Sequence, residues 1–341
     1  MCIVFYTLSQ PGYKLILAAN RDEYLDRPSL PAAWHTFGRV PASAPNAETI
    51  NKARKESPIQ EDAEEQDWVL CGRDLGSPMA GTWLGMTRDL RVAVLTNIRQ
   101  PYCPSPHPSP PSRGLLLKNF LAPRPSPSNP TVHDYLDSYS PVMDDYEGFN
   151  LLCFKLHLDE HLPTEIGYLS NRPRPAKTLT DLWPSSRPAS PVGGAKGAKV
   201  GQCFGLSNSP MTRPWPKVVE GEEAMRMTLD EWADKLETED ELVERMMTLL
   251  SPGDAIDTLA DTSKTTRLQP LLVGPNADLF PTPEDKKRWY GTTLSTVILV
   301  KDSGETVFVE RDIGVLDGKG GATPGSKSNE RRFAFTAVDS Q

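Results

Sequence analysis

Two apolar runs separated by a turn signal open the chain and predict a β-hairpin. The runs cover residues 2–8 and 14–20 and consist mainly of β-branched, aromatic and aliphatic residues. Pro11-Gly12 lies between them, and this dipeptide marks a tight turn. Antiparallel partners keep a constant sum of residue numbers, so we expect Cys2 to lie opposite Asn20, Arg21 or Asp22.

The remaining apolar positions predict strands and helices that alternate along the chain. Short runs of strand composition lie at 68–71, 81–87, 91–97, 149–157, 165–170, 295–301, 305–311 and 332–337. Helical spacing and start signals predict helices over 113–122, 131–139, 216–236 and 239–250. Hairpins that alternate with helix pairs indicate a layered α+β fold of antiparallel sheets rather than a doubly wound parallel sheet.

Segments rich in Pro, Ser, Gly and charged residues interrupt these elements. They cover 41–66, 101–112, 123–130, 184–200 and 313–328. Such compositions bury too little apolar surface to offset the entropy of ordering, so we expect flexible insertions in one domain spanning 1–341. A scaffold function through the proline spacing of 101–111 is an alternative that the sequence leaves open.

Composition narrows the class of protein. The 341 residues carry a net charge of −8, which disfavours nucleic acid as a partner. No apolar run approaches the roughly 18 residues of a membrane helix, and Gln10-Pro11-Gly12 interrupts the N-terminal run before it resembles a signal peptide. The five cysteines are scattered without a CxxC pair, as in a reducing compartment. We therefore expect a cytoplasmic protein without an integral membrane segment.

Cys2 is the candidate nucleophile. A small residue behind Met1 favours removal of the methionine, which would leave a free α-amino group on the residue that carries the thiol. An amine with a pKa of about 7.7–8.0 can act as general base for a thiol of about 8.5 without any histidine. An ordinary buried cysteine at the start of a strand fits the same position. The polar residues opposite favour a site, where Asp22 would hold the α-ammonium and Arg21 would stabilise a thiolate or bind a substrate carboxylate.

Several motifs carry a family resemblance that spans nearly the whole chain. They are Met1-Cys2, Leu17-Ala18-Ala19-Asn20-Arg21-Asp22-Glu23, Gly81-Thr82-Trp83-Leu84-Gly85, Leu95-Thr96-Asn97, Ser112-Arg113-Gly114, Gly148-Phe149-Asn150-Leu151, Tyr168-Leu169-Ser170-Asn171-Arg172, Phe204-Gly205-Leu206-Ser207-Asn208-Ser209 and Tyr290-Gly291-Thr292. In this combination and order they resemble the NRDE family, also called Transport and Golgi organisation protein 2. The resemblance implies the four-layer αββα sandwich of N-terminal nucleophile hydrolases.

The resemblance also implies site residues. Asn97 and Asn208 match the two asparagines that choloylglycine hydrolases and penicillin acylases use as oxyanion or substrate donors, although both also suit turns. Asn20 and Asp22 match a strand-borne Asn-x-Asp, in which the aspartate orients the amine. The expected catalytic residues are thus Cys2, Asp22, Asn97 and Asn208.

The chain departs from those hydrolases at two arginines. Ala19 occupies the position three residues before the aspartate, and Thr293 the position after Gly-Thr. Arg213, or else Arg172, is the expected replacement. The expected substrate-binding residues are Asn20, Arg21 and Arg213.

Two functions from different classes follow. The first is a cysteine amidohydrolase that cleaves a non-peptide C–N amide through Cys2, with a role in Golgi organisation and the secretory pathway. The second is a non-catalytic carrier that binds haem or an acyl-lipid in the same pocket, with at most peripheral association with Golgi or mitochondria. We expect no resident cofactor or metal, because Cys103 with His107, and Cys153 with His157, supply too few ligands for a structural zinc site.

Overall fold

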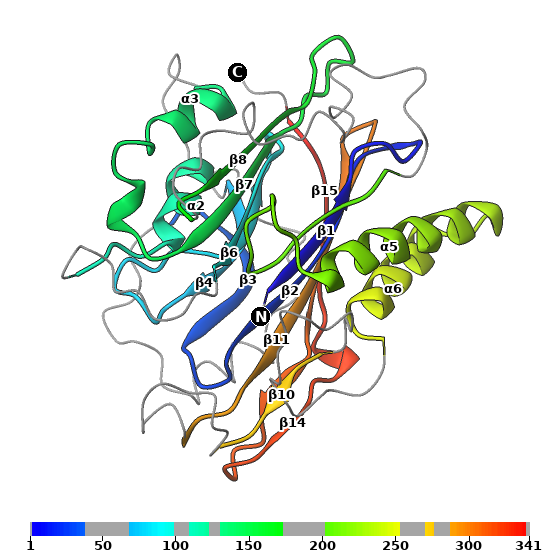
Figure 1. The fold of residues 1–341 in the computed structure, drawn as a ribbon. Helices are drawn as coiled ribbons and strands as arrows, with labels where there is room; N and C mark the ends of the chain where they lie inside the picture. Colours follow the sequence, from blue (N-terminus) through cyan, green and yellow to red (C-terminus); the bar gives the residue numbers. More distant parts are fainter. Residues whose placement is uncertain are drawn as a thin grey trace.

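Two antiparallel sheets form the centre of the fold (Figure 1). The computed structural model describes residues 2–37, 68–98, 109–122, 130–172, 202–252, 270–275 and 287–338. The first sheet has the order β15-β12-β11-β2-β1-β9, and β10 pairs with β11 outside this path. Its strands are β1 (Ile3–Thr7), β2 (Tyr13–Tyr24), β9 (Phe204–Leu206), β10 (Leu272–Val273), β11 (Tyr290–Lys301), β12 (Glu305–Asp312) and β15 (Arg331–Thr336).

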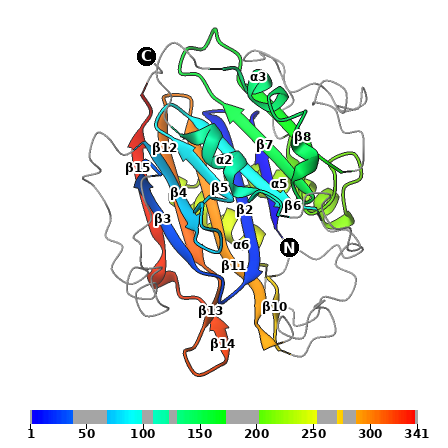
Figure 2. The ribbon, with the colours of Figure 1, turned by 90° about the vertical axis from the view of Figure 1, so that its left-hand side faces the viewer.

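The second sheet is a meander in which each strand pairs with the next along the chain, β3-β4-β5-β6-β7-β8. Its strands are β3 (Ser29–His35), β4 (Val69–Asp74), β5 (Leu84–Thr87), β6 (Arg91–Asn97), β7 (Phe149–Lys155) and β8 (Glu165–Ser170). The turn after β2 leads directly into β3, so the first hairpin connects the two sheets (Figure 2).

Helices cover the outer face of each sheet and complete four layers. On the first sheet lie α5 (Pro216–Asp234) and α6 (Glu239–Leu250), whose apolar residues pack against Ile3 and Phe5. On the second lie α2 (Gly114–Leu121) and α3 (Val132–Asp137). Figure 1 shows the two helix pairs on opposite sides of the sheets. The structure thus confirms the expected four-layer αββα sandwich of antiparallel sheets.

The alternation of side chains explains why the run Ile3–Tyr6 is apolar at every position. Val4 and Tyr6 are buried between the two sheets, whereas Ile3 and Phe5 point to the helices on the other face. Successive side chains of a strand face opposite ways, so a strand covered on both faces has no polar side. Only the ends of such a strand can carry polar chemistry.

The predicted helices are confirmed, with ends that differ by a few residues. Both α3 and α6 begin with a capping box, in which Thr131 and Thr238 accept from the backbone N–H three residues on. The first hairpin is also confirmed, and β2 extends four residues beyond its predicted end to Tyr24.

Strand β3 is absent from the predicted strands, and it contains Pro31, a residue that cannot donate a backbone hydrogen bond to a neighbouring strand. The structure accommodates it at an irregularity between Leu30 and Ala33, where the backbone N–H of Ala32 donates to Glu310 instead of a neighbouring strand. The segment 313–328, expected to be a flexible insertion, contains the hairpin of β13 (Gly314–Leu316) and β14 (Ala322–Pro324), and the short helix η3 (Lys327–Asn329) follows. The predicted insertions 41–66 and 184–200, together with residues 101–108 and 123–129 of the other two, lie outside the described residues.

Candidate functional site

Cys2 lies at the start of the central strand β1, between two neighbours. Ile3 pairs with Asn20 on β2, so the preceding residue, Cys2, is level with Arg21, as the hairpin predicted. Val4 pairs with Leu206 on β9, and the same register continued places Cys2 level with Asn208. The Ser207 hydroxyl donates to the Cys2 carbonyl oxygen at 2.8 Å, which ties the loop after β9 to residue 2.

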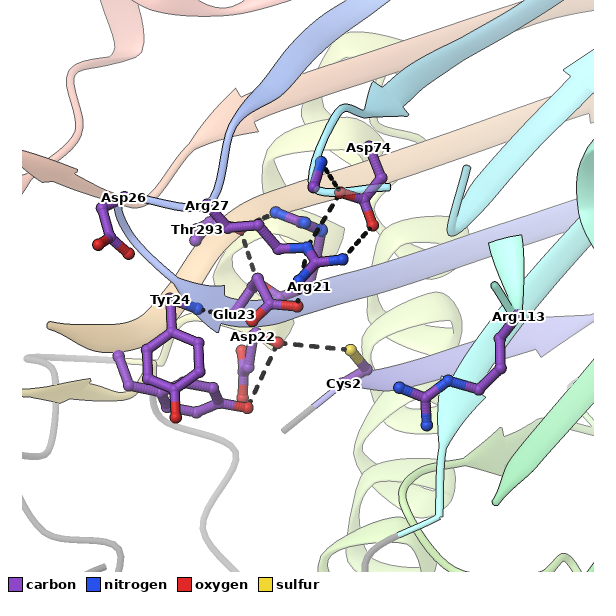
Figure 3. A network of polar contacts seen from close by, with 12 residues as sticks. Cys2, Arg21, Asp22, Glu23, Tyr24, Asp26, Arg27, Asp74, Arg113 and Thr293 are labelled. Carbon is purple, nitrogen blue, oxygen red and sulfur yellow. Dashed lines mark hydrogen bonds and ion pairs between the residues drawn. The ribbon is translucent and has the colours of Figure 1, made fainter. Parts of the chain in front are cut away.

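A polar cleft of about 390 Å³ opens at Cys2. Its walls come from the end of β2, from the end of β6 and from the segment that leads into α2. Seven charged side chains are part of the lining, which includes Cys2, Arg21, Asp22, Glu23, Arg27, Asp74, Thr82, Trp83, Asn97, Arg113 and Glu147. Figure 3 shows Arg21 and Arg113 on different elements around Cys2, with the Arg21 guanidinium next to Thr293.

The surroundings of Cys2 favour the neutral thiol over the thiolate. The residue is half-buried, and its Sγ donates to the backbone carbonyl of Asp22 at 3.9 Å. Burial raises the pKa of this thiol, and the positive charges of the chain's amino terminus, Arg21 and Lys217 oppose the rise. A base close to the sulfur is therefore required before Cys2 can act as a nucleophile.

Asp22 contacts Cys2 through its backbone carbonyl oxygen. The same Asp22 carbonyl oxygen also accepts from the Tyr290 hydroxyl at 3.4 Å (Figure 3). The expected contact between the Asp22 carboxylate and an α-ammonium stays a prediction.

The side chains of Asn20 and Arg21 separate to opposite faces of β2. The Asn20 amide donates to the Leu250 carbonyl at the end of α6 at 2.9 Å and accepts from Ser295, so it stabilises a helix end. Arg21 instead faces the cleft, stacks on the Trp83 ring at 4.1 Å and donates to the Thr293 hydroxyl at 3.3 Å. Alternation along the strand separates the two, and the expected substrate contact of Asn20 is replaced by a structural one.

Asn97 and Asn208, two of the residues predicted for the site, contact each other near Cys2. The Asn208 side-chain amide donates to the Asn97 backbone carbonyl at 2.6 Å. Asn208 is 5% exposed, and within the described part of the chain its buried amide oxygen has no hydrogen-bond partner. An acceptor buried in this way is unusual, because nearly all buried polar atoms find a donor.

Comparison with known proteins adds a family to this geometry. The family model for Transport and Golgi organisation 2 matches residues 1–44 and 51–314. The chain belongs to this family. A mouse protein named Transport and Golgi organization 2 homolog is 27% identical over 321 residues, covering 92% of this chain and 93% of the mouse protein. The Drosophila melanogaster Transport and Golgi organization protein 2 is 24% identical over 339 residues, covering 94% and 95%.

Solved structures give only weak matches. A penicillin V acylase from Agrobacterium tumefaciens has a TM-score of 0.36 at 11% identity and covers 91% of this chain and 83% of its own. A mutant conjugated bile acid hydrolase from Clostridium perfringens has a TM-score of 0.35 at 8% identity, covering 100% and 99%. Similarity at this level carries no information about the chemistry of the family member described here.

In this member of the Transport and Golgi organisation 2 family, Asn150 holds the loop that carries Asn208. Its amide nitrogen donates to the carbonyls of Ser207 and Ser209 at 3.1 and 3.0 Å. The Tyr168 hydroxyl donates to the Asn150 amide oxygen at 2.6 Å, and Thr96 also donates to the Ser207 carbonyl, at 2.6 Å. Two further motifs of the chain, Phe149-Asn150-Leu151 and Tyr168-Leu169, therefore join the sheets next to Cys2.

The expected arginine at position 213 is not part of the cleft. Arg213 is exposed and is absent from the cleft lining. Arg172 donates a hydrogen bond to the Asn171 carbonyl and lies near the Asp144 carboxylate. The cleft instead receives Arg27 and Arg113, which sequence reasoning missed. Arg113 was visible only as part of Ser112-Arg113-Gly114, and nothing local indicated where that motif would lie.

Close packing of two glycines brings Arg113 to the cleft. A Cβ on Gly81 would lie 2.5 Å from the Gly114 carbonyl carbon, so only glycine permits this approach. The backbone N–H of Thr82 donates to the Gly114 carbonyl at 3.4 Å across the same contact. The start of α2 is thereby placed beside Thr82 and Trp83, which line the cleft.

Two searches of the described residues complete the site. None of the helices there is both long and apolar enough to cross a bilayer. The same residues contain no group of three or more His, Cys, Asp or Glu side chains arranged to bind a metal ion.

Proposed function

We propose that this family member is an N-terminal cysteine amidohydrolase that cleaves a non-peptide C–N amide through Cys2. The observation that carries the proposal is the position of Cys2, half-buried in a polar cleft and level with Arg21 on one side and Asn208 on the other. A nucleophile, polar donors and a space for substrate are thus adjacent.

The proposed reaction proceeds through a thioester. After removal of Met1 the α-amine of Cys2 takes the thiol proton, and the sulfur attacks the amide carbon. The proton passes to the departing amine as the C–N bond breaks, and water then hydrolyses the thioester to release the acid. The oxyanion would accept from the Asn97 side-chain amide and from the N–H of Asn208 that does not donate to Asn97.

The Asn208 amide oxygen, which has no hydrogen-bond partner among the described residues, has a role in the same scheme. An amide oxygen in this position accepts a hydrogen bond, and the α-ammonium of a trimmed Cys2 is a donor at the level of Asn208. Asp22 would supply the negative charge that orients this ammonium. The α-amine of Cys2 is thus a part of the site that exists only after Met1 has been removed.

The carrier hypothesis has less support. An acyl chain or haem needs a large apolar surface, whereas the surface that lines the cleft at Cys2 is mostly polar. The apolar cavity that extends from Cys2 past Ala19, Leu84 and Val94 has a volume of only about 10 Å³, room for roughly one water molecule. Small polar amides fit this arrangement better.

The cellular role is proposed from the relatives. The mouse and fly proteins are named for transport and Golgi organization, and we propose that this chain serves Golgi organisation and the secretory pathway. We place it in the cytoplasm, with at most peripheral association with Golgi or mitochondria.

Intact mass and thiol labelling test the proposal. We expect the purified chain to lack Met1 and a thiol-reactive probe to label Cys2, with turnover of an amide substrate abolished in Cys2→Ala. Cys2→Ser tests whether a weaker nucleophile on the same amine retains a trace of activity. Retention of Met1, or full complementation of a null cell line by Cys2→Ala, would contradict the catalytic proposal and favour the carrier.

A further inference from the structure

Three guanidinium groups line the cleft, and they differ in how firmly the protein pairs them. Arg27 is fully engaged. Its Nε and Nη2 donate to the two oxygens of Asp74 at 2.9 Å each, and Glu23 lies 3.6 Å from its Nε. A bidentate pair of this kind is among the strongest arginine contacts. Arg27 is therefore a structural part of the wall.

Arg113 is paired much more loosely. Its Nη2 lies 3.2 Å from the Glu147 carboxylate, and the Glu147 side chain is 58% exposed while that of Arg113 is 24% exposed. Ion pairs with so exposed a carboxylate contribute little to stability, because water solvates the carboxylate almost as well. A ligand anion can therefore replace Glu147 at small cost.

A second contact keeps Arg113 in place when Glu147 leaves. Its Nη1 donates to the Gly148 carbonyl at 3.1 Å. Because this acceptor is backbone, the guanidinium stays oriented in the cleft whether or not a carboxylate is present. Arg113 can therefore exchange Glu147 for a ligand anion while it keeps its hydrogen bond to the Gly148 carbonyl.

The segment that supplies both partners is fixed by Asn171. This side chain is fully buried, and its amide nitrogen donates to the carbonyls of Met143, Tyr146 and Glu147 at 2.9, 3.1 and 3.2 Å. Its oxygen accepts from the backbone N–H of Phe149 at 2.9 Å. The motif Ser170-Asn171-Arg172 therefore acts by holding the backbone around Gly148 against the edge of the cleft.

Arg21 gives the opposite wall the same capacity. It is 7% exposed, and its contacts within the described residues are neutral, the Trp83 ring and the Thr293 hydroxyl. A buried guanidinium without a carboxylate is costly and is favoured when a ligand supplies the anion. Cys2 lies in the cleft with this residue and Arg113 (Figure 3).

We propose that Arg113 is an anion-binding residue of the Cys2 cleft, that Glu147 is its displaceable counter-ion, and that the amide substrate carries an anionic group. This inference deepens the proposed function, because it names the substrate class of the same site. Arg113 is the specificity-determining residue, and neutral amides of equal size are poorer ligands.

The test compares two alkylating reagents at Cys2. Iodoacetate and iodoacetamide both form a C–S bond to the thiolate with loss of iodide, but only iodoacetate is anionic. Peptide mass spectrometry gives the rate constant of each at Cys2, and their ratio cancels changes in the reactivity of the thiol itself. The ratio for iodoacetate over iodoacetamide is expected to fall about fivefold in Arg113→Gln, as for loss of one cation across a solvated cleft. It is expected to rise two- to fivefold in Glu147→Gln and to change little in Arg113→Lys.

Arg245→Gln is the matched control. Arg245 has a similar exposure, 22%, and pairs with the carboxylate of Glu237, but it lies on α6 and not in the cleft lining. Its ratio should equal that of the unsubstituted chain. If Arg113→Gln does not fold, the pair Arg113→Lys and Glu147→Gln carries the test.

Unchanged ratios in both Arg113→Gln and Glu147→Gln would overturn the inference, whatever Cys2→Ala shows about catalysis. If Cys2 reacts with neither reagent, thermal stabilisation by N-acetylglycine decides instead, with N-acetylglycinamide as the neutral probe. Stabilisation by the acid alone, lost in Arg113→Gln, supports the inference. Equal effects of the two probes contradict it.

Discussion

Two regions between the sheets, both within the described residues, bring arginines and carboxylates together, and they differ in how many carboxylates hold each arginine. Where β3 meets β12 and β15, Arg331 donates to Glu310 at 2.9 Å and to Asp312 at 2.7 Å, with all three side chains no more than 3% exposed. Glu310 also accepts from the backbone of Ala32 on the other sheet at 2.8 Å. This buried cluster joins the two sheets along one edge.

In the Cys2 cleft the pairing is incomplete. Arg27 has two carboxylate partners, Arg113 has an exposed one, and the contacts of Arg21 within the described residues are neutral. A buried charge needs a partner, so a cluster that pairs every cation is structural, whereas one that leaves a cation short of anions can bind a ligand. The number of charged side chains in a region therefore does not indicate a binding site. The number of carboxylate partners that each arginine has is the better indicator.

We expect the largest loss of stability from a substitution that breaks the buried cluster around Arg331. Arg331→Met would leave two carboxylates buried without a cation, which costs about 3–5 kcal/mol of the free energy of unfolding. Urea denaturation measures this loss. Alkylation of Cys2 in the folded fraction should be unchanged, and a loss below about 1 kcal/mol would show that the cluster does not join the sheets.

Gly81→Ala tests how the cleft receives Arg113. The added Cβ meets the backbone of Gly114 at 2.5 Å, so the start of α2 must move. We expect a loss of up to about 3 kcal/mol, as for overpacking, and a lower preference of Cys2 for iodoacetate over iodoacetamide. Denaturation and alkylation rates measure the two effects. Normal stability with an unchanged preference would mean that the glycine contact does not position Arg113.

Lowering the pH tests how much His35, as distinct from the two charge clusters, contributes to the free energy of unfolding. Burial, together with the charge of Arg73, lowers the pKa of His35 to about 4, and its ring contacts the Cys71 thiol at 3.2 Å. Between an unfolded pKa of about 6.5 and this value the unfolded chain binds a proton that the folded chain does not. Stability should therefore fall as pH falls through this window, by about 2 kcal/mol.

His35→Gln is the control for this pH dependence. Denaturation of both chains between pH 7.5 and 4 should give a shallower decline for the variant. Parallel curves would assign the acid loss to carboxylates instead.

The smallest expected effect is that of Arg21→Met. Loss of the stacking on Trp83 is offset by removal of a buried charge without a carboxylate, so the free energy of unfolding should change by less than about 1 kcal/mol. The preference of Cys2 for iodoacetate should nevertheless decrease. A destabilisation of 3 kcal/mol or more, measured by urea denaturation, would show that Arg21 is structural, like Arg331.

Local signals in the sequence were enough for much of the frame. Pro11-Gly12 between two apolar runs placed Cys2 opposite Asn20, Arg21 or Asp22, because a short turn leaves few registers, and the structure selects Arg21. Thr131 and Thr238 began their helices as capping residues. The family motifs led to the αββα layers, and Asn97 and Asn208 do lie side by side.

The failures arise where a residue's role depends on distant partners. Asn20 is adjacent to Arg21 in sequence but faces the end of α6, and Pro31 lies in a strand because Glu310 accepts the hydrogen bond of Ala32. Gly314–Leu316 pairs within a glycine-rich segment whose composition predicted no strand.

The sequence by itself determined the first hairpin, the helix starts and the family, and it singled out Cys2 as the candidate nucleophile, since these depend on neighbours in the chain and on motifs. Only the tertiary structure decided which arginines enter the cleft, replacing Arg213 with Arg27 and Arg113, and which asparagine is structural. The physical reason is that a guanidinium or amide side chain takes its role from the partner it reaches. Those partners, Asp74, Glu147 and Leu250, are brought close by sheet packing over separations that no local pattern encodes.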